Sequence, residues 1–401
     1  MNPSTLLLLL SWLIPSSPLG AGPPSPTEEK IDIVRLSGEE VSPSFIEILS
    51  PGVVALTDGE GRTEIPLENL RSITFTGREA SPLAGTALFL AGGGVLAGEV
   101  LSADGEKIKF GSPLIDETSI SLASIRAIRI TPVSIDTTAF QRQMEKKKPN
   151  DTVFVIQEKK LLRVPGGFRF LNREKLSFVW EGQEKTLPRE KIHGIVLSGG
   201  SVGRGARTAR VLLTDGSRFE GEPVAMDRAA LTMRLMDSSR LVIARGSVVR
   251  IEILSDRLVY LSDLEPIKVR EVPYFNTIWP YRKDRSLDGN PIRLGGEVYE
   301  KGLGVHSRCL LTYELDGEYE SFSAVIGIDD ETEDLGHVIF RVRADGEVVF
   351  ESGGISGVDK PRRIQLDLKG KQRLVLEVDF GEDLDIGDHA DWADAHLVRK
   401  S

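Results

Sequence analysis

Two short motifs decide the fold of the last third of the chain: KGLGVHS at residues 301–307 and DHADWADAH at residues 388–396. Both motifs lie among runs in which apolar and polar residues alternate, the period-two pattern of half-buried strands. The clearest runs occupy residues 322–328, 338–344, 364–368 and 374–380, and Asp345-Gly346 is a hairpin turn between two strands. Residues 256–401 are therefore predicted to form one β-sandwich whose loops are free to carry a ligand.

The preceding two thirds of the chain also predict strands and turns. Four segments share one pattern, at residues 70–75, 125–130, 192–197 and 248–253, and Asp-Gly turns at 104–105 and 215–216 separate apolar runs. A short 3₁₀ or helical turn is expected before each closing strand. We predict two β-repeat domains, at residues 31–132 and 152–254. Each is expected to be a pair of small, strongly bent, Sm-like or SH3-like partial barrels.

The segments outside these domains are predicted to connect or to export them. Residues 1–21 contain an apolar run at 6–14 followed by helix breakers and small residues, the pattern of a signal peptide. An uncleaved tether is the alternative, because no Lys or Arg precedes the apolar run. Residues 22–30 form a Pro/Ser/Glu-rich linker, and residues 133–151 are expected to be a linker with a short helix, closed by a solvated lysine triplet. After cleavage of the signal, the chain has no segment with transmembrane character.

The order of the C-terminal fragments resembles the NPCBM family, which is related to family 51 carbohydrate-binding modules. Further fragments carry the resemblance, among them YLSDL at 260–264, NPIRLGG at 290–296 and GIDD at 327–330. The resemblance implies a galactose-binding-like jelly roll that binds a glycan as an accessory to catalysis. The whole chain is then all-β, with two small-barrel-like β domains followed by the jelly-roll sandwich. Cys309 stands where many family members carry Ser, and it is predicted to be a buried structural thiol.

Five side chains are the candidate ligand-binding residues: Trp279, Tyr281, His306, His389 and Trp392. Sugar rings present C–H faces that stack on aromatic rings, while their hydroxyl groups hydrogen-bond to polar side chains. Trp279 and Tyr281 lie in a loop beside charged residues. Gly302 and Gly304 permit tight backbone geometry before His306, and a core histidine is the alternative interpretation. Trp392 is either the core anchor of the last strand or a platform for a sugar ring.

The acidic residues of the C-terminal region raise the question of a metal. Calcium prefers oxygen-rich loops, and galactose-binding-like folds often hold a structural calcium, so Asp329, Asp330 and Asp394 are its candidate ligands. Zinc needs three or four converging ligands. The alternation of Asp388, His389, Asp391, Asp394 and His396 does not place such a set on one face. Solvated acidic loops without any metal are the remaining alternative.

The charge and the motifs of the chain limit the functions that it can have. The net charge of −10 belongs to the last module. Residues 256–401 hold 19 Lys/Arg against 30 Asp/Glu, which argues against nucleic acid as a partner. No nucleophile and base have a recognisable local signature. We therefore expect an exported, non-catalytic carbohydrate-binding protein. Its alternatives are a cell-envelope protein that makes protein contacts without binding sugar, and a glycoside hydrolase of unrecognised type.

Overall fold

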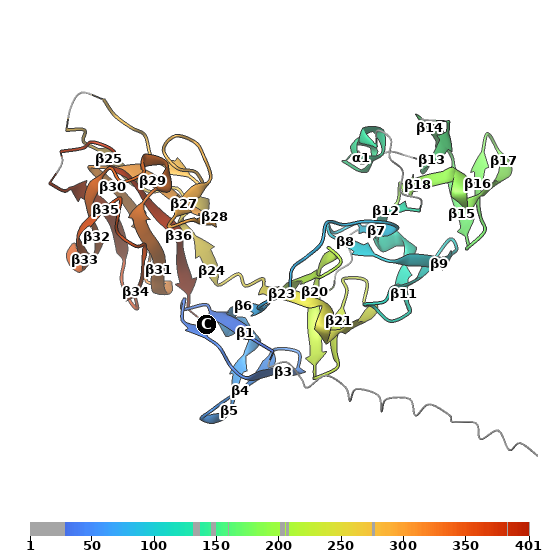
Figure 1. The fold of residues 1–401 in the computed structure, drawn as a ribbon, viewed down its shortest axis with the longest axis horizontal. Coiled ribbons are helices and arrows are strands. Elements are labelled where there is room, and N and C mark those ends of the chain that lie inside the picture. Colours follow the sequence, from blue (N-terminus) through green and yellow to red (C-terminus); the bar gives the residue numbers. More distant parts are fainter. Residues whose placement is uncertain are drawn as a thin grey trace, which may run out of the picture.

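The computed structural model describes residues 29–130, 137–145, 150–158, 160–200, 205, 208–274, 277–382 and 384–400 (Figure 1). The predicted signal peptide and all but the last two residues of the predicted linker lie outside these residues. Within them the chain is built from strands, short 3₁₀ helices and one α-helix, α1 (Thr138–Glu145), so the all-β prediction is confirmed. No helix in the described part of the chain is long and apolar enough to cross a membrane.

Residues 31–253 form four β-units with a common strand order. Each unit ends in a 3₁₀ helix and a closing strand, and the four segments with a shared sequence pattern supply these closing strands. The first unit contains β1 (Ile31–Arg35), β2 (Glu40–Val41), β3 (Phe45–Ser50), β4 (Val53–Asp58), β5 (Gly61–Pro66), η1 (Leu67–Asn69) and β6 (Leu70–Phe75). The second contains β7 (Ala87–Leu90), β8 (Val95–Ala97), β9 (Glu99–Ala103), β10 (Lys107–Gly111), β11 (Thr118–Ser121), η2 (Leu122–Ser124) and β12 (Ile125–Arg129).

The third and fourth units follow α1. The third contains β13 (Thr152–Gln157), β14 (Lys160–Pro165), β15 (Gly167–Leu171), β16 (Lys175–Trp180), β17 (Gln183–Pro188), η3 (Arg189–Lys191) and β18 (Ile192–Val196). In the fourth, one long strand replaces two: it contains β19 (Ala209–Leu213), β20 (Arg218–Met226), β21 (Ala230–Arg234), β22 (Arg240–Ala244), η4 (Arg245–Ser247) and β23 (Val248–Ile253). Within every unit the first strand pairs with the closing strand.

The units pair in a nested order that corrects the predicted domain boundaries. The closing strands β6 and β23 pair with each other, so the first unit joins the fourth. The closing strands β12 and β18 likewise join the second unit to the third. One hydrophobic core runs from residue 31 to residue 253 across all four units. Residues 31–132 and 152–254 are therefore not two separate domains, and no sheet among the described residues closes into a barrel. The alternation of apolar and polar residues identifies strands, but it does not reveal which strands from distant parts of the sequence pair with each other.

The C-terminal module is a sandwich of two antiparallel sheets, as predicted (Figure 1). One sheet has the order β26-β29-β36-β31-β34, with β24 also paired to β36, and the other has the order β25-β30-β35-β32-β33. The elements are β24 (Leu258–Tyr260), η5 (Leu261–Asp263), β25 (Lys268–Glu271), β26 (Arg282–Lys283), β27 (Ile292–Leu294), β28 (Glu297–Tyr299), β29 (Gly302–His306), β30 (Cys309–Glu314), β31 (Tyr319–Ile328), η6 (Asp330–Thr332), β32 (His337–Ala344), β33 (Glu347–Ser356), β34 (Arg362–Asp367), β35 (Arg373–Phe380) and β36 (His389–Arg399).

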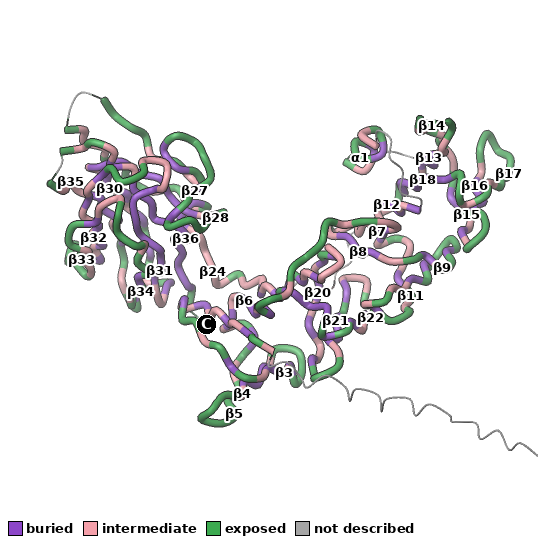
Figure 2. The backbone as a smooth tube through the Cα atoms, viewed as in Figure 1, coloured by how far each residue is buried: buried purple, intermediate pink, exposed green. Residues whose placement is uncertain are grey.

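The inner faces of these two sheets supply the core of the module. Figure 2 shows buried residues running along β31 and β36, while the outer loops are exposed. Phe322, Phe340 and Trp392 are among the largest buried side chains. Cys309 is also buried, and burial raises the pKa of its thiol. A thiol that is both inaccessible and protonated is structural rather than reactive.

Candidate functional site

Three of the predicted ligand-binding residues meet at one end of the sandwich. The rings of Trp279 and His306 are stacked, with centroids 5.7 Å apart and an interplanar angle of 13°. His389 lies beside both rings, 5.7 Å from Trp279 and 5.9 Å from His306 by their centroids. Trp279 keeps 42% of its surface exposed, whereas His306 keeps 7%. The two histidines thus form a nearly buried floor, and the tryptophan presents an aromatic surface to solvent.

Strand register explains why the histidines are neighbours. His306 ends β29 and His389 begins β36, and the two residues are directly paired in the antiparallel ladder. Directly paired residues on adjacent antiparallel strands hold their side chains close on the same face. Gly304, on β29, permits a neighbouring loop to approach this strand, because a Cβ there would lie 2.5 Å from the backbone oxygen of Arg285. The loop at residues 284–290 consequently packs beside the site.

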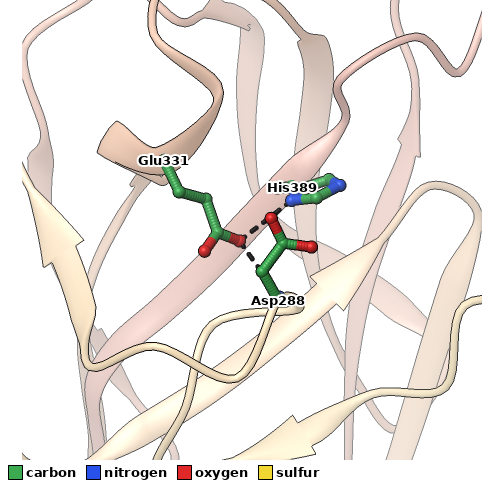
Figure 3. Close-up of side chains that lie close together, drawn as sticks. All are labelled: Asp288, Glu331 and His389. Atoms are coloured by element: carbon green, nitrogen blue, oxygen red, sulfur yellow. Dashed lines mark hydrogen bonds and ion pairs between the residues drawn. The ribbon is translucent and has the colours of Figure 1, made fainter.

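Glu331, in η6, ties this loop to His389 (Figure 3). Its Oε2 accepts hydrogen bonds from Ser286 Oγ at 2.6 Å and from Asn290 Nδ2 at 3.2 Å. Its Oε1 accepts from the backbone N–H of Asp288 at 3.3 Å and lies 2.9 Å from His389 Nδ1. One carboxylate therefore fixes the loop and one of the two histidine rings.

These contacts also set the ionisation of Glu331 and the tautomers of the two histidines. Burial opposes the ionisation of Glu331, but hydrogen bonds from Ser286, His389 and Asn290 outweigh burial and lower the pKa of Glu331. A carboxylate can only accept, so His389 donates its Nδ1–H, and its Nε2 is an acceptor in the neutral ring. His306 Nδ1 lies 2.9 Å from the backbone oxygen of Ser307, which assigns the same tautomer. In these tautomers, each neutral ring has its Nε2 as an acceptor beside the aromatic surface of Trp279.

The two remaining ligand-binding candidates lie elsewhere. Trp392 is 1% exposed and packs edge-on against Phe340, with centroids 4.9 Å apart. It is the core anchor of β36, which is one of the two interpretations that the sequence left open, and it is not exposed to a ligand in this structure. Tyr281 packs its ring against the sandwich core, and its backbone N–H donates to Glu271 Oε1 at 2.7 Å.

The three predicted calcium ligands do not converge. Asp329 accepts backbone N–H groups from Glu331 and Arg293, at 2.9 and 3.0 Å. Asp330 accepts those of Gly295 and Gly296, at 2.8 and 2.7 Å. Asp394 is bound by both terminal nitrogens of Arg71, in the first β-unit. These carboxylates thus face different N–H donors in different parts of the structure and do not form one ligand set in it. Calcium binding itself stays a prediction.

Another group of possible metal ligands is present beside the aromatic cluster. Asp288, Glu331 and His389 each offer a ligand atom, and these atoms lie within 4.8 Å of one another. A mixed oxygen and nitrogen set of this kind suits a transition metal better than calcium. The Glu331 oxygens, however, already have the hydrogen-bond donors described above. Within this group, Glu331 therefore serves first to position His389.

Several residues of the site were not among the predicted ligand residues. Ser286, Asp288 and Asn290 lie in one polar loop. Glu331 lies in the acidic stretch where only the two preceding residues were proposed as metal ligands. The loop carries turn-forming residues around Gly289, which mark a turn but give no indication of its contact with η6. Only the fold brings residue 286 to residue 331.

Comparison with known proteins identifies the module that holds this site. Residues 257–398 match the family model described as the NPCBM/NEW2 domain. The C-terminal sandwich is an NPCBM/NEW2 domain. A protein of Renibacterium salmoninarum, provisionally named an endo-alpha-N-acetylgalactosaminidase, is 34% identical over 145 residues, which cover 35% of this chain and 9% of that protein. Alpha-1,3-galactosidase B of Akkermansia muciniphila is 29% identical over 117 residues, 28% of this chain and 15% of that protein.

Each of these relatives matches only part of this chain and a small part of its own length. The matched residues thus span less than a sixth of the length of either curated relative. A CBM51 module from Clostridium perfringens GH95, solved in complex with methyl-galactose, is 33% identical with a TM-score of 0.32, over 35% of this chain and 99% of that one. CBM51-2 with INT domains from Clostridium perfringens ZmpB, solved in complex with GlcNAc, is 28% identical with a TM-score of 0.33, over 42% and 36%.

Proposed function

We propose that the protein is an exported, non-catalytic carbohydrate-binding protein that recognises a glycan at the Trp279, His306 and His389 cluster. The observation that carries the proposal is the partly exposed Trp279 ring stacked on His306, in a domain of a carbohydrate-binding module family. Aromatic surface beside a few fixed polar groups is the common design of a small-ligand site. Export is proposed from the predicted signal peptide at residues 1–21.

In the proposed complex, the protein contacts both the C–H face and the hydroxyl groups of the sugar. The exposed surface of Trp279 takes the C–H face of a sugar ring, and the Nε2 atoms of His306 and His389 accept hydrogen bonds from hydroxyl groups. Glu331 holds His389 in position before the ligand arrives, so little conformational entropy is lost on binding.

The chemistry of Glu331 supports binding rather than catalysis. A glycosidase acid needs a raised pKa so that it carries a proton at neutral pH, and it needs a second carboxylate placed across the scissile bond. The pKa of Glu331 is lowered, and four donors of the protein surround its two oxygens. Glu331 is therefore a fixed acceptor and a poor proton donor. Turnover of a polysaccharide by the purified chain would refute the non-catalytic part of the proposal.

The experiment is a glycan-array screen of the full chain, with Trp279→Ala as the test variant. Specific binding by the wild type is expected, with at least about a tenfold loss in Trp279→Ala because a central aromatic contact is removed. Trp180→Ala is the matched control: Trp180 is 40% exposed, against 42% for Trp279, but lies in the third β-unit. Its glycan binding is expected to equal that of the wild type.

Two array results would reject the proposal. A blank array from a chain whose thermal melt shows a folded protein would favour the alternative, a cell-envelope protein that makes protein contacts only. Equal binding by the wild type and Trp279→Ala would place the glycan at another surface. Adding EDTA to the same array tests the calcium prediction, since a required calcium would make binding sensitive to chelation.

A further inference from the structure

The third β-unit has an exposed apolar groove that the proposed glycan site does not use. The groove has a volume of about 410 Å³ and lies between β13, β14, β16 and β17. Leu162 and Trp180 on its walls are 50% and 40% exposed, and Phe178 and Leu187 line its floor. Solvent exposure of two large apolar side chains beside a groove is a common mark of an interaction site.

Comparing the strand registers of the third and fourth units shows which surface of the fourth unit corresponds to this groove. In the third unit Leu176 pairs with Leu187, and in the fourth unit Leu231 pairs with Ile243. Each of these pairs stands one residue before the end of the strand that precedes the 3₁₀ helix. Counting from these pairs, Phe178 corresponds to Met233, and Trp180 corresponds to Leu235. In the fourth unit these positions are covered: Met233, Leu235 and Ile243 are 0, 4 and 0% exposed.

A segment of the second unit provides this cover. Ile115 forms an isolated β-bridge with Ile243 and is 1% exposed. The backbone N–H of Ala244 donates to Leu114 O, and that of Asp116 donates to Val242 O, both at 2.9 Å. Two aliphatic residues followed by an acidic one thus lie against β22, in the bend between β10 and β11, and they cover the edge strand that stays open in the third unit.

The first unit shows what the same surface looks like when no cover is needed. Val54 pairs with Ile65 as Leu176 pairs with Leu187, so the position of Trp180 is held by Asp58 in the first unit. Asp58 is exposed, and its Oδ1 accepts the backbone N–H groups of Glu60 and Gly61. A terminal unit of a stacked array needs a polar outer face to remain soluble. The first unit meets this requirement, and the third unit carries a tryptophan instead.

We propose that the groove of the third unit binds a short polypeptide segment of a partner protein, with two adjacent aliphatic residues followed by an acidic residue. The aliphatic pair fills the space between Leu162 and Trp180, as Leu114 and Ile115 fill the fourth unit. The acidic residue meets Arg163 and Lys185, which line the groove together with no Asp or Glu. This partner is independent of the glycan.

Pro188 limits the mode of binding. It takes the position of Ala244, and proline has no N–H to donate. The backbone of the partner can therefore donate to the carbonyl of Thr186, which corresponds to Val242. The partner cannot accept a hydrogen bond like the one that Ala244 donates, because Pro188 has no N–H. A proline at a sheet edge also prevents open-ended strand addition. The groove consequently accepts one short segment and does not nucleate a growing sheet.

The test is fluorescence anisotropy with the full chain and a labelled peptide of residues 110–118, FGSPLIDET. The wild type is expected to bind it, and Trp180→Asp, which copies the first unit, is expected to weaken binding at least about tenfold. A peptide with Ser at both aliphatic positions should not bind. Trp279→Asp is the matched control and should keep full peptide affinity, whatever its effect on glycan binding.

The outcomes separate this proposal from its competitors. No binding by the wild type, or equal binding by the wild type and Trp180→Asp, overturns it. Sedimentation of the wild type as a dimer and of Trp180→Asp as a monomer also overturns it, since a second copy would then cover the groove. A thermal melt checks that Trp180→Asp folds, and Leu162→Asp replaces it if it does not. Loss of glycan binding alone leaves the peptide result intact.

Discussion

At the scale of single residues, Glu331 controls the candidate glycan site through His389. We predict that Glu331→Gln lowers glycan affinity about tenfold, the loss expected when a charge-assisted hydrogen bond of about 1.4 kcal/mol is removed. The amide keeps the volume of the side chain but halves its acceptors, so the ring of His389 is no longer held. Isothermal titration calorimetry of wild type and variant with the best array ligand measures the effect. Glu300→Gln is the matched control, because Glu300 is exposed and distant in sequence from η6.

The lowered pKa of Glu331 adds a pH dependence to this prediction. A carboxylate whose pKa is depressed in the folded protein contributes fully above its ordinary value of 4.5, and its contribution is lost as the pH falls through the lowered value. Any effect of Glu331 on glycan affinity should therefore be constant above pH 4.5 and decline only in stronger acid. A Glu331-dependent decline between pH 5 and 7, absent from Glu331→Gln, would contradict the assignment.

Residue patterns could predict part of this site. A tryptophan in a charged loop, and histidines at the ends of two motifs, were enough to choose Trp279, His306 and His389, which the structure brings together. The role of Asp394 could not be predicted, because its partner Arg71 is 323 residues away in the chain. The loop position of Trp279 and the strand position of Trp392 suggested that the first is exposed and the second is buried, and the packing of the sheets decides it.

At the scale of elements, the contact between closing strands depends on a glycine. Gly194 of β18 pairs with Arg129 of β12, and a Cβ at this position would lie 2.5 Å from Ile128 O and 2.8 Å from the ring of Phe140. We predict that Gly194→Ala destabilises the protein by about 1–3 kcal/mol, because the paired strands must move apart to admit a methyl group. The midpoint of urea unfolding measures the loss.

A second glycine of the same unit provides the control. A Cβ at Gly167, in β15, would meet no atom within 4 Å. Gly167→Ala should therefore leave the unfolding midpoint unchanged or slightly raised, since alanine lowers the entropy of the unfolded chain. Equal stability of Gly194→Ala and Gly167→Ala would show that the close approach of the closing strands contributes nothing.

Sequence patterns were more informative about strands than about their partners. The shared pattern at residues 70–75, 125–130, 192–197 and 248–253 located the four closing strands and the turn before each. Pairing of the first unit with the fourth, however, joins Ile73 to Ile251, and nothing in either strand specifies the other. Apolar edges of similar length are interchangeable in a sequence, so the choice between consecutive and nested units depends on packing of the whole chain.

At the scale of the whole molecule, the sandwich contacts the first β-unit through a polar junction. Asp394 binds both terminal nitrogens of Arg71, whose Nη2 also donates to Tyr260 Oη at 3.0 Å. Nearby, Arg257 donates to Asn69 at 3.0 Å, and Ser323 donates to Ser37 O at 3.1 Å. In Figure 1 the chain passes from β23 to β24 at this junction, so the module is held by side chains as well as by the connection.

The Arg71 and Asp394 pair should therefore stabilise the arrangement of the two parts. Their side chains are 19 and 10% exposed, so water screens the pair only partly. We predict that Arg71→Ala and Asp394→Ala each lower the free energy of unfolding by about 2 kcal/mol, the usual cost of losing a hydrogen bond to a charged group. The double variant should lose less than the sum, because the second substitution removes a side chain that has already lost this ion pair. Urea unfolding measures the cycle, and small-angle scattering should show a wider spread of shapes in each variant. Strictly additive losses would mean that the two side chains act separately and that the junction depends on its other contacts.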